Sequence, residues 1–266
     1  MQERSDGEIR QAVRERYGDI ALTDPAGCGC EPSSCCGQNT APTSDDISVD
    51  LGYSREDVSI VPEGANMGLG CGNPQAIAAA QPGETVLDLG SGGGFDCFLA
   101  AKAVGIHGHV IGVDMTADMV RKARENAAKG GFRNVEFRLG EIEHIPAADN
   151  SINVIISNCV INLSPEKKQV FTDAFRVLKP SGRLAISDIV ATAPLPEAVK
   201  HDLALYTGCM AGATLIDELA SILEAAGFVD IRITPRDESK AFIREWTPES
   251  TLEDYIVSAS IEAIKQ

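Results

Sequence analysis

The fold of this chain is decided by the stretch Val86-Leu87-Asp88-Leu89-Gly90-Ser91-Gly92-Gly93-Gly94-Phe95. A short apolar run leads directly into a turn of glycines, and a helical pattern over residues 95–104 follows it. Glycine tolerates positive φ angles and lets the backbone approach a ligand closely. Because open α/β sheets bind ligands beyond the carboxyl ends of their strands, this order of strand, turn and helix predicts a ligand-binding loop.

The glycine spacing bears on which ligand the loop takes. It reads G-x-G-x-G, and Phe95 stands where the third glycine of the dinucleotide pattern G-x-G-x-x-G would fall, which disfavours a dinucleotide. Asp114 ends the next predicted strand and offers a carboxylate that can accept two hydrogen bonds from ribose hydroxyls. Met115, Glu141 and Ile142 follow the second and third strands, where we expect them beside an adenine ring.

Strand-like and helix-like patterns alternate outward from this loop. The strand candidates are short, apolar and rich in Val, Ile or Leu, as strands buried on both faces are. They cover residues 85–89, 109–113, 134–138, 152–157 and 183–189. The helical patterns between them cover residues 95–104, 116–129 and 166–178. Such alternation is typical of a parallel, doubly wound, Rossmann-like α/β sheet.

The C-terminal part extends this pattern. A helix is predicted over residues 214–226 and a strand over 229–234. A final strand-like stretch, residues 255–264, follows a connection long enough to reverse the chain direction. We therefore expect an antiparallel last strand inserted in the sheet, which brings the predicted total to seven strands.

The N-terminal part has a different character. An amphipathic helix is predicted over residues 6–20, and a loop rich in Pro, Gly and Ser follows to about residue 46. Pro74 suits the first turn of a short helix through Ala80. We expect an N-terminal part, residues 1–80, and an α/β domain with acceptor-site loops, residues 81–266.

The overall composition narrows the classes of partner. The 266 residues carry a formal net charge of −16, and such a surface repels nucleic-acid phosphates and anionic lipid headgroups. No apolar run approaches the roughly 18 residues that span a bilayer, and the N-terminus lacks the apolar core of a secretion signal. We therefore expect a cytoplasmic protein without a nucleic-acid or membrane partner. We also expect a monomer. Its 8 cysteines are then expected as soft ligands or reactive thiols rather than disulfides.

The glycine loop, Asp114 and the late segment Leu178-Lys179-Pro180-Ser181-Gly182-Arg183-Leu184 together resemble class I S-adenosylmethionine-dependent methyltransferases over about residues 80–190. The resemblance implies a seven-stranded sheet that ends in an antiparallel strand, and S-adenosylmethionine as the cofactor. The cofactor-binding residues that we expect on this basis are Asp88, Gly90, Ser91, Gly92, Gly94, Asp114, Met115, Glu141, Ile142 and Asn158.

Three cysteines occupy positions that a core packing role does not require. Cys71 lies between glycines just before a predicted helix, whose dipole is expected to favour a thiolate. Cys159 follows the fourth strand, and Cys209 follows the fifth strand on the same rim of the sheet. Three sulfurs that converge there would suit a thiophilic centre such as trivalent arsenic. Cys97, by contrast, is expected to face the core from a helix.

The sequence is also similar to arsenite methyltransferases over nearly its whole length. The similarity is carried by Leu69-Gly70-Cys71-Gly72-Asn73-Pro74, Ser157-Asn158-Cys159-Val160-Ile161-Asn162-Leu163 and Gly208-Cys209-Met210-Ala211-Gly212-Ala213. It implies that Cys71, Cys159 and Cys209 bind arsenic as catalytic ligands, and that arsenite or its thiol conjugates are methylated for detoxification. It also implies a thiol reductant, glutathione or thioredoxin, as co-substrate.

Two features depart from that family's pattern. Longer members carry a further C-terminal domain, and this sequence stops soon after the last strand, so the extent of methylation is open. The family also has an N-terminal cysteine that can pair with the first arsenic ligand. Four candidates stand here, Cys28, Cys30, Cys35 and Cys36. Early capture of arsenic, a disulfide with Cys71 or no role all stay open for them, and their spacing is poor for zinc.

Two other functions are compatible with the central motifs. A methyltransferase acting on carbon, with a quinone or sterol precursor as acceptor, usually needs a base beside that acceptor, and no histidine stands at the fourth-strand rim. A metalloid-binding protein without catalysis would not need the intact glycine loop and Asp114. Transfer of a methyl group to arsenic is therefore the function that the sequence favours.

Overall fold

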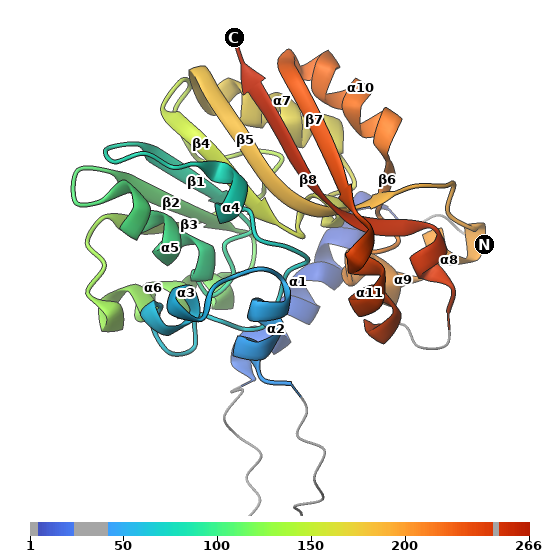
Figure 1. Cartoon of the computed structure of the whole chain (residues 1–266), viewed down its shortest axis with the longest axis horizontal. Helices are drawn as coiled ribbons and strands as arrows, with labels where there is room; N and C mark the ends of the chain where they lie inside the picture. Colours follow the sequence, from blue (N-terminus) through green and yellow to red (C-terminus); the bar gives the residue numbers. More distant parts are fainter. Residues whose placement is uncertain (1–4, 24–41, 247–249) are drawn as a thin grey trace, which may run out of the picture.

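The computed structural model describes residues 5–23, 42–246 and 250–266 (Figure 1). Its centre is one sheet in the order β3-β2-β1-β4-β5-β8-β7. The strands are β1 (Thr85–Leu89), β2 (His109–Asp114), β3 (Val135–Leu139), β4 (Ile152–Asn158), β5 (Leu178–Ala191), β7 (Phe228–Arg236) and β8 (Ile256–Lys265). A two-residue strand, β6 (Thr214–Leu215), pairs with the end of β5.

The direction of the strands follows the prediction. Strands β1 to β5 are parallel, whereas β8 runs antiparallel to both of its neighbours, β5 and β7. The predicted mostly parallel sheet with an antiparallel last strand inserted in it is therefore confirmed.

Helices cover both faces of the sheet (Figure 1). On one face, α7 (Lys167–Val177) and α10 (Ile216–Ala226) pack against one set of buried strand residues that includes Leu87. On the other, α5 (Phe95–Val104) and α6 (Ala117–Gly130) pack against the alternate set, which includes Val86. Because neighbouring side chains of β1 are buried on opposite faces, the apolar runs in the sequence reflect strands that no water reaches.

The N-terminal part contains α1 (Asp6–Leu22), α2 (Ser44–Asp50), α3 (Arg55–Ile60) and α4 (Gln75–Ala78). It begins at the carboxyl edge of the sheet, where α1 lines a cavity, and ends with α4 packed on the sheet face beside β4 and β5. Helix α4 is shorter than predicted because Ala79 adopts a left-handed conformation, with φ 45°, and ends the helix at Ala78. Helix α1 begins with a capping box between Ser5 and Glu8 and packs against α6.

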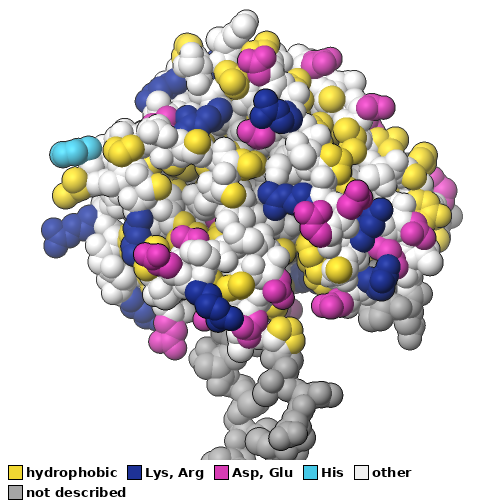
Figure 2. All heavy atoms as spheres, in the orientation of Figure 1, with side chains coloured by type: hydrophobic (Ala, Val, Ile, Leu, Met, Phe, Trp, Pro, Cys, Tyr) yellow, Lys and Arg dark blue, Asp and Glu magenta, His cyan; other side chains and the backbone are white. Residues whose placement is uncertain are grey.

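The remaining helical turns surround the same edge of the sheet. They are α8 (Glu197–Lys200), α9 (Leu203–Thr207), α11 (Lys240–Trp246) and the 3-10 turns Ile161–Leu163, Asp237–Ser239 and Leu252–Asp254. None of the helices in the described part of the chain has the length and apolar character needed to cross a membrane. On the face shown in Figure 2, acidic and basic side chains are interspersed.

Candidate active site

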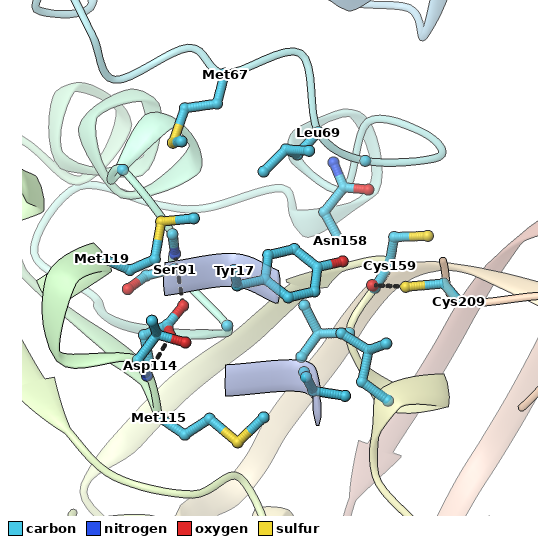
Figure 3. Close-up of a pocket in the computed structure, with 18 of the residues that line it drawn as sticks. Tyr17, Met67, Leu69, Ser91, Asp114, Met115, Met119, Asn158, Cys159 and Cys209 are labelled. Atoms are coloured by element: carbon cyan, nitrogen blue, oxygen red, sulfur yellow. Dashed lines mark hydrogen bonds between the residues drawn. The ribbon is translucent and has the colours of Figure 1, made fainter. Parts of the chain in front are cut away.

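A cavity of about 430 Å³ opens at the carboxyl ends of the parallel strands. One wall is the glycine loop after β1 together with the end of β2, and the facing wall carries Cys159 and Cys209 (Figure 3). Helix α1 contributes a third wall, and Figure 3 shows the Tyr17 ring between the two others. The cavity thus occupies the place where an open α/β sheet is expected to bind ligands.

The glycine loop requires glycine at its first position. Gly90 has a φ of 74°, and a Cβ built on it would lie 2.3 Å from Val160 Cγ2. Asp114 braces the loop from β2 because its carboxylate accepts the Gly92 amide at 3.0 Å and the Thr116 amide at 2.8 Å. The loop and the acid predicted to bind the cofactor are therefore held together before any ligand arrives.

An unpartnered polar atom tests whether this wall fits the cofactor. The Ser91 hydroxyl lines the cavity and is buried without a hydrogen-bond partner in the described residues. A buried hydroxyl normally has a partner, so this one is available to a ligand. Together with the backbone that the glycines expose, it fits the polar ribose and amino-acid ends of S-adenosylmethionine.

The structure separates the predicted cofactor residues into two groups. Those that line the cavity are Asp88, Gly90, Ser91, Gly92, Asp114, Met115, Ile142 and Asn158. Gly94 does not line it: its backbone, with φ 95°, begins α5, and a Cβ there would lie 2.8 Å from the Phe98 ring. Glu141 does not line the cavity either, and it pairs with Arg14 of α1. Nothing in the sequence indicated that α1 would contact the loop after β3.

The three predicted cysteines come together in one buried cluster. The Cys71 and Cys159 sulfurs and a carboxylate oxygen of Asp188 all lie within 4.8 Å of one another. The Cys209 thiol donates to the Cys159 carbonyl oxygen at 2.6 Å (Figure 3). The three segments that carry these cysteines, although distant in sequence, thus lie together in the structure as predicted. Cys97 lies elsewhere, fully buried, with its sulfur 3.2 Å from Asp88, and its predicted core position is confirmed.

The predicted thiolate at Cys71 is wrong for this state of the protein. Burial raises the pKa of the Cys71 thiol, and α4 is only four residues long, so its dipole does not compensate. For Cys159, the contact with Cys209 lowers the pKa, but the contact with Cys71 and burial outweigh it. The contact with Cys159 and burial raise the pKa of Cys209 well above its ordinary value. The three thiols are therefore protonated until a ligand replaces their protons.

Asp188, near the carboxyl end of β5, is a residue beside the cysteines that the sequence did not reveal. It is buried, and burial raises its pKa to about 6. Its carboxylate accepts the Ile161 amide at 2.9 Å and the Asn162 side-chain amide at 2.9 Å. Asn162 in turn donates to the Cys209 carbonyl at 3.3 Å, so Asp188 fixes both cysteine loops. In the sequence, only its position as an acid within an otherwise apolar predicted strand could have indicated a role in the site.

Tyr17 of α1 is the second residue that sequence reasoning missed as part of the site. Burial raises the pKa of its phenol well above the ordinary value, and the neighbouring Cys209 and Cys159 add to this. The hydroxyl also reaches the Thr207 carbonyl at 3.4 Å. The sequence predicts an amphipathic helix over residues 6–20, which includes Tyr17, but such a pattern does not say what the apolar face of the helix covers.

Comparison with known proteins agrees with this geometry. Residues 80–227 match a family model described as a methyltransferase domain. The chain is 54% identical to an arsenite methyltransferase of Halobacterium salinarum, over 99% of this chain and 68% of that protein. It is 35% identical to an arsenite methyltransferase of Mus musculus, over 86% of this chain and 60% of that protein.

Solved structures give the same relationship. An arsenic (III) S-adenosylmethionine methyltransferase from Chlamydomonas reinhardtii superposes with a TM-score of 0.63 at 32% identity, over 85% of this chain and 75% of that one. A geranyl diphosphate C-methyltransferase from Streptomyces coelicolor superposes with a TM-score of 0.67, but at 14% identity it supports the fold alone. The chain belongs to the arsenite methyltransferase family, and its residues 80–227 form a methyltransferase domain.

Proposed function

We propose that this chain transfers a methyl group from S-adenosylmethionine to trivalent arsenic that Cys71, Cys159 and Cys209 hold through their sulfur atoms. The observation that carries the proposal is the meeting of three buried thiols beside a cavity whose opposite wall is the glycine loop; Cys159 and Cys209 line this cavity, and the Cys71 sulfur lies behind them in contact range of Cys159. The family relationship supports arsenite as the acceptor. Sulfur ligands suit this acceptor because thiolates prefer soft, thiophilic centres.

The three thiols can bind arsenite without a protein base to accept their protons. Each new bond between sulfur and arsenic displaces one hydroxyl of As(OH)₃, which takes the thiol proton and leaves as water. A thiol conjugate of arsenite exchanges in the same way, and the departing thiol takes the proton. The raised pKa values of the cysteines are compatible with this exchange because the leaving group removes each proton.

The chain's part in the methyl transfer is to hold and align. When bound, S-adenosylmethionine supplies a methyl group on a positively charged sulfur. Arsenic with three sulfur ligands keeps a lone pair, so the acceptor has no proton for a general base to remove. Of the described residues that line the cavity, none is a histidine, which agrees with this chemistry. Alignment of the lone pair with the methyl carbon in a buried site is then the main contribution of the protein.

The reaction consumes reducing equivalents in this proposal. Donation of the lone pair to a methyl group raises the formal oxidation state of arsenic by two, and return to the trivalent state takes two electrons. A thiol reductant, glutathione or thioredoxin, supplies two electrons when it forms a disulfide. The products are methylated arsenicals, and detoxification is the role that follows from them.

Methyl transfer from labelled S-adenosylmethionine to arsenite in the presence of thiol tests the proposal. The Cys159→Ser variant should lose activity by at least about 100-fold, because removal of a ligand disturbs the alignment on which the rate depends. Cys97→Ser is the matched control, since Cys97 is equally buried but lies outside the cluster, and it should keep near wild-type activity.

X-ray absorption of the arsenic complex provides an independent measurement. Three sulfur neighbours are expected in the wild type and in Cys97→Ser, and fewer in Cys159→Ser. Full activity of Cys159→Ser, or an arsenic atom with oxygen neighbours only, would rule out this ligand set.

A further inference from the structure

Two buried carboxylates face the cavity on the side of the glycine loop. Asp88 at the end of β1 and Asp96 in the first turn of α5 are 3% and 8% exposed, and both line the cavity. In the described part of the chain neither forms an ion pair: the Cys97 thiol contacts Asp88, while Tyr53 and Gln75 donate to Asp96. Buried acids of this kind normally have a cationic partner.

The pKa values of Asp88 and Asp96 also favour a cationic partner. Burial raises the pKa of Asp88 well above its usual range, and the neighbouring Asp96 adds to the effect. Burial also raises the pKa of Asp96, to about 6, although donors from Tyr53, Gln75 and Asn158 oppose it. A positive group from a ligand would relieve both effects.

The cofactor of this family offers such a group on its amino-acid end. We propose that Asp96 receives the α-ammonium group of S-adenosylmethionine, and that Tyr53 and Asn158 connect this contact to the backbone of Cys71. The proposal rests on the cofactor assigned above, but it does not depend on arsenic as acceptor. Asp96 is favoured over Asp88 because hydroxyl and amide donors fix its carboxylate at the cavity wall, whereas Asp88 contacts the core thiol of Cys97.

A continuous series of hydrogen bonds links Asp96 to the first arsenic ligand. The Tyr53 hydroxyl donates to the two Asp96 oxygens at 2.9 and 3.0 Å. The Asn158 side-chain amide donates to the Tyr53 hydroxyl at 3.1 Å, and its oxygen accepts the Cys71 amide at 3.0 Å. The Tyr53 ring is itself fixed edge-on against Phe95, with centroids 4.9 Å apart.

The Cys71 segment has little freedom to move independently of Asn158. The Asn158 amide also donates to the Gly72 carbonyl at 2.8 Å. Gly70 has a φ of 134°, and a Cβ on it would lie 2.8 Å from the Asn158 nitrogen. Tyr53 and Asn158 are therefore positioning residues, which hold Cys71 at a fixed place relative to the ammonium site.

Calorimetric titration without arsenic tests the ammonium site. The probes are S-adenosylhomocysteine and 4-(5′-adenosylthio)butanoate, which is the same molecule without its amine. Because a hydrogen bond to a charged group contributes about 1.5–3 kcal/mol, the amine should strengthen binding to the wild type by about 10- to 100-fold. In Asp96→Asn the ratio should fall to within about threefold.

Two further variants make this titration decisive. Asp173→Asn is the matched control, because Asp173 is also 8% exposed but bonds to Ile145 and Arg176 away from the cavity. It should keep the wild-type ratio, and Asp88→Asn should keep most of it. An unchanged ratio in Asp96→Asn, or its loss in Asp88→Asn alone, overturns the assignment. Neither outcome bears on whether arsenic is the acceptor, so the two proposals fail separately.

Hydrogen exchange at the Cys71 amide tests the connection to the thiol. S-adenosylhomocysteine should slow exchange in a peptide covering residues 69–75 by about tenfold more than the analogue without an amine, because the ammonium group stabilises the hydrogen-bonded series. Tyr53→Phe, which keeps the ring and loses the hydroxyl, should remove this difference, as should Asp96→Asn. Tyr255→Phe, outside the series, should keep it. Equal protection by both ligands in the wild type, or an unchanged difference in Tyr53→Phe, contradicts the connection.

Discussion

Two of the three proposed arsenic ligands have a backbone conformation that side chains rarely adopt. Cys159 has a φ of 60° and Cys209 a φ of 65°. Such a conformation in a residue other than glycine costs on the order of 1–3 kcal/mol and persists only where the surroundings hold it. Here Asn162 bonds to the Cys209 carbonyl, and the Cys159 amide donates to the Ser187 carbonyl at 2.8 Å. Backbone strain at both cysteines is expected where function, and not packing alone, requires the sulfur atoms to lie at these positions.

Gly90 allows a sharp test of the cofactor loop at the scale of one residue. Gly90→Ala should lower S-adenosylmethionine affinity by at least about tenfold, because the methyl group would overlap Val160 and displace the loop. Gly83→Ala is the matched control, since Gly83 also has a positive φ, 87°, but has open space around it. Its cost should be limited to about 1 kcal/mol of stability, from the φ angle alone.

Calorimetry measures the affinities and urea unfolding the stabilities of these two variants. If both lose cofactor affinity equally, backbone strain rather than overlap with Val160 governs the loop.

Helix α1 closes the cavity through ion pairs with the loops after β3 and β4. Arg10 bonds to Glu143 at 3.2 Å and also contacts Glu166, while Arg14 contacts Glu141. The Arg10 side chain is 15% exposed and Glu143 is buried, so this pair is shielded from water. The same helix carries Tyr17 to the thiols, so its position bears on both walls of the site.

Arg10→Ala should therefore destabilise the protein by about 2 kcal/mol or more, because it leaves Glu143 buried without its cation. The variant should also release cofactor faster, since the third wall of the cavity loosens. Arg121→Ala is the control: Arg121 pairs with Glu125 on the exposed face of α6, and its loss should leave both stability and release unchanged. Urea unfolding and stopped-flow displacement of S-adenosylhomocysteine measure these effects. Equal behaviour of the two variants would show that α1 does not close the site.

The elements themselves were largely predictable from the sequence, whereas their contacts were not. Strand β1 was predicted with its observed bounds because a strand buried on both faces is a continuous apolar run, and the glycines ended it. The α1 pattern predicted a helix but not its place over the cavity, since amphipathicity does not name a partner. The pKa of Cys71 was predicted in the wrong direction because burial depends on segments far away in the sequence.

The role of Asp188 could not be predicted for the same reason, since it depends on contacts with other loops. The four cysteines before residue 37 lie outside the described residues.

At the scale of the whole molecule, the site is assembled where several chain segments end at one edge of the sheet. The glycine loop follows β1, Cys159 follows β4, and Cys209 follows α9. Cys71 comes from the segment before α4, and the Ser258 hydroxyl of β8 donates to its carbonyl at 2.6 Å. The inserted last strand thus helps to hold the first thiol, so the antiparallel end of the sheet contributes to the proposed acceptor site as well as to the core.

Arsenite should therefore link segments that separate only when the whole domain unfolds. In a background with Cys28, Cys30, Cys35 and Cys36 changed to Ser, arsenite at about 100 times its Kd should raise the unfolding free energy by up to about 2.7 kcal/mol, because three sulfurs held together bind it more tightly than the separated thiols of the unfolded chain. Thermal unfolding at increasing arsenite concentrations measures this as a rising Tm. Adding Cys159→Ser should abolish most of the rise, whereas adding Cys97→Ser should leave it intact. A Tm that does not respond to arsenite in the background protein would mean that the three sulfurs do not bind one arsenic atom together.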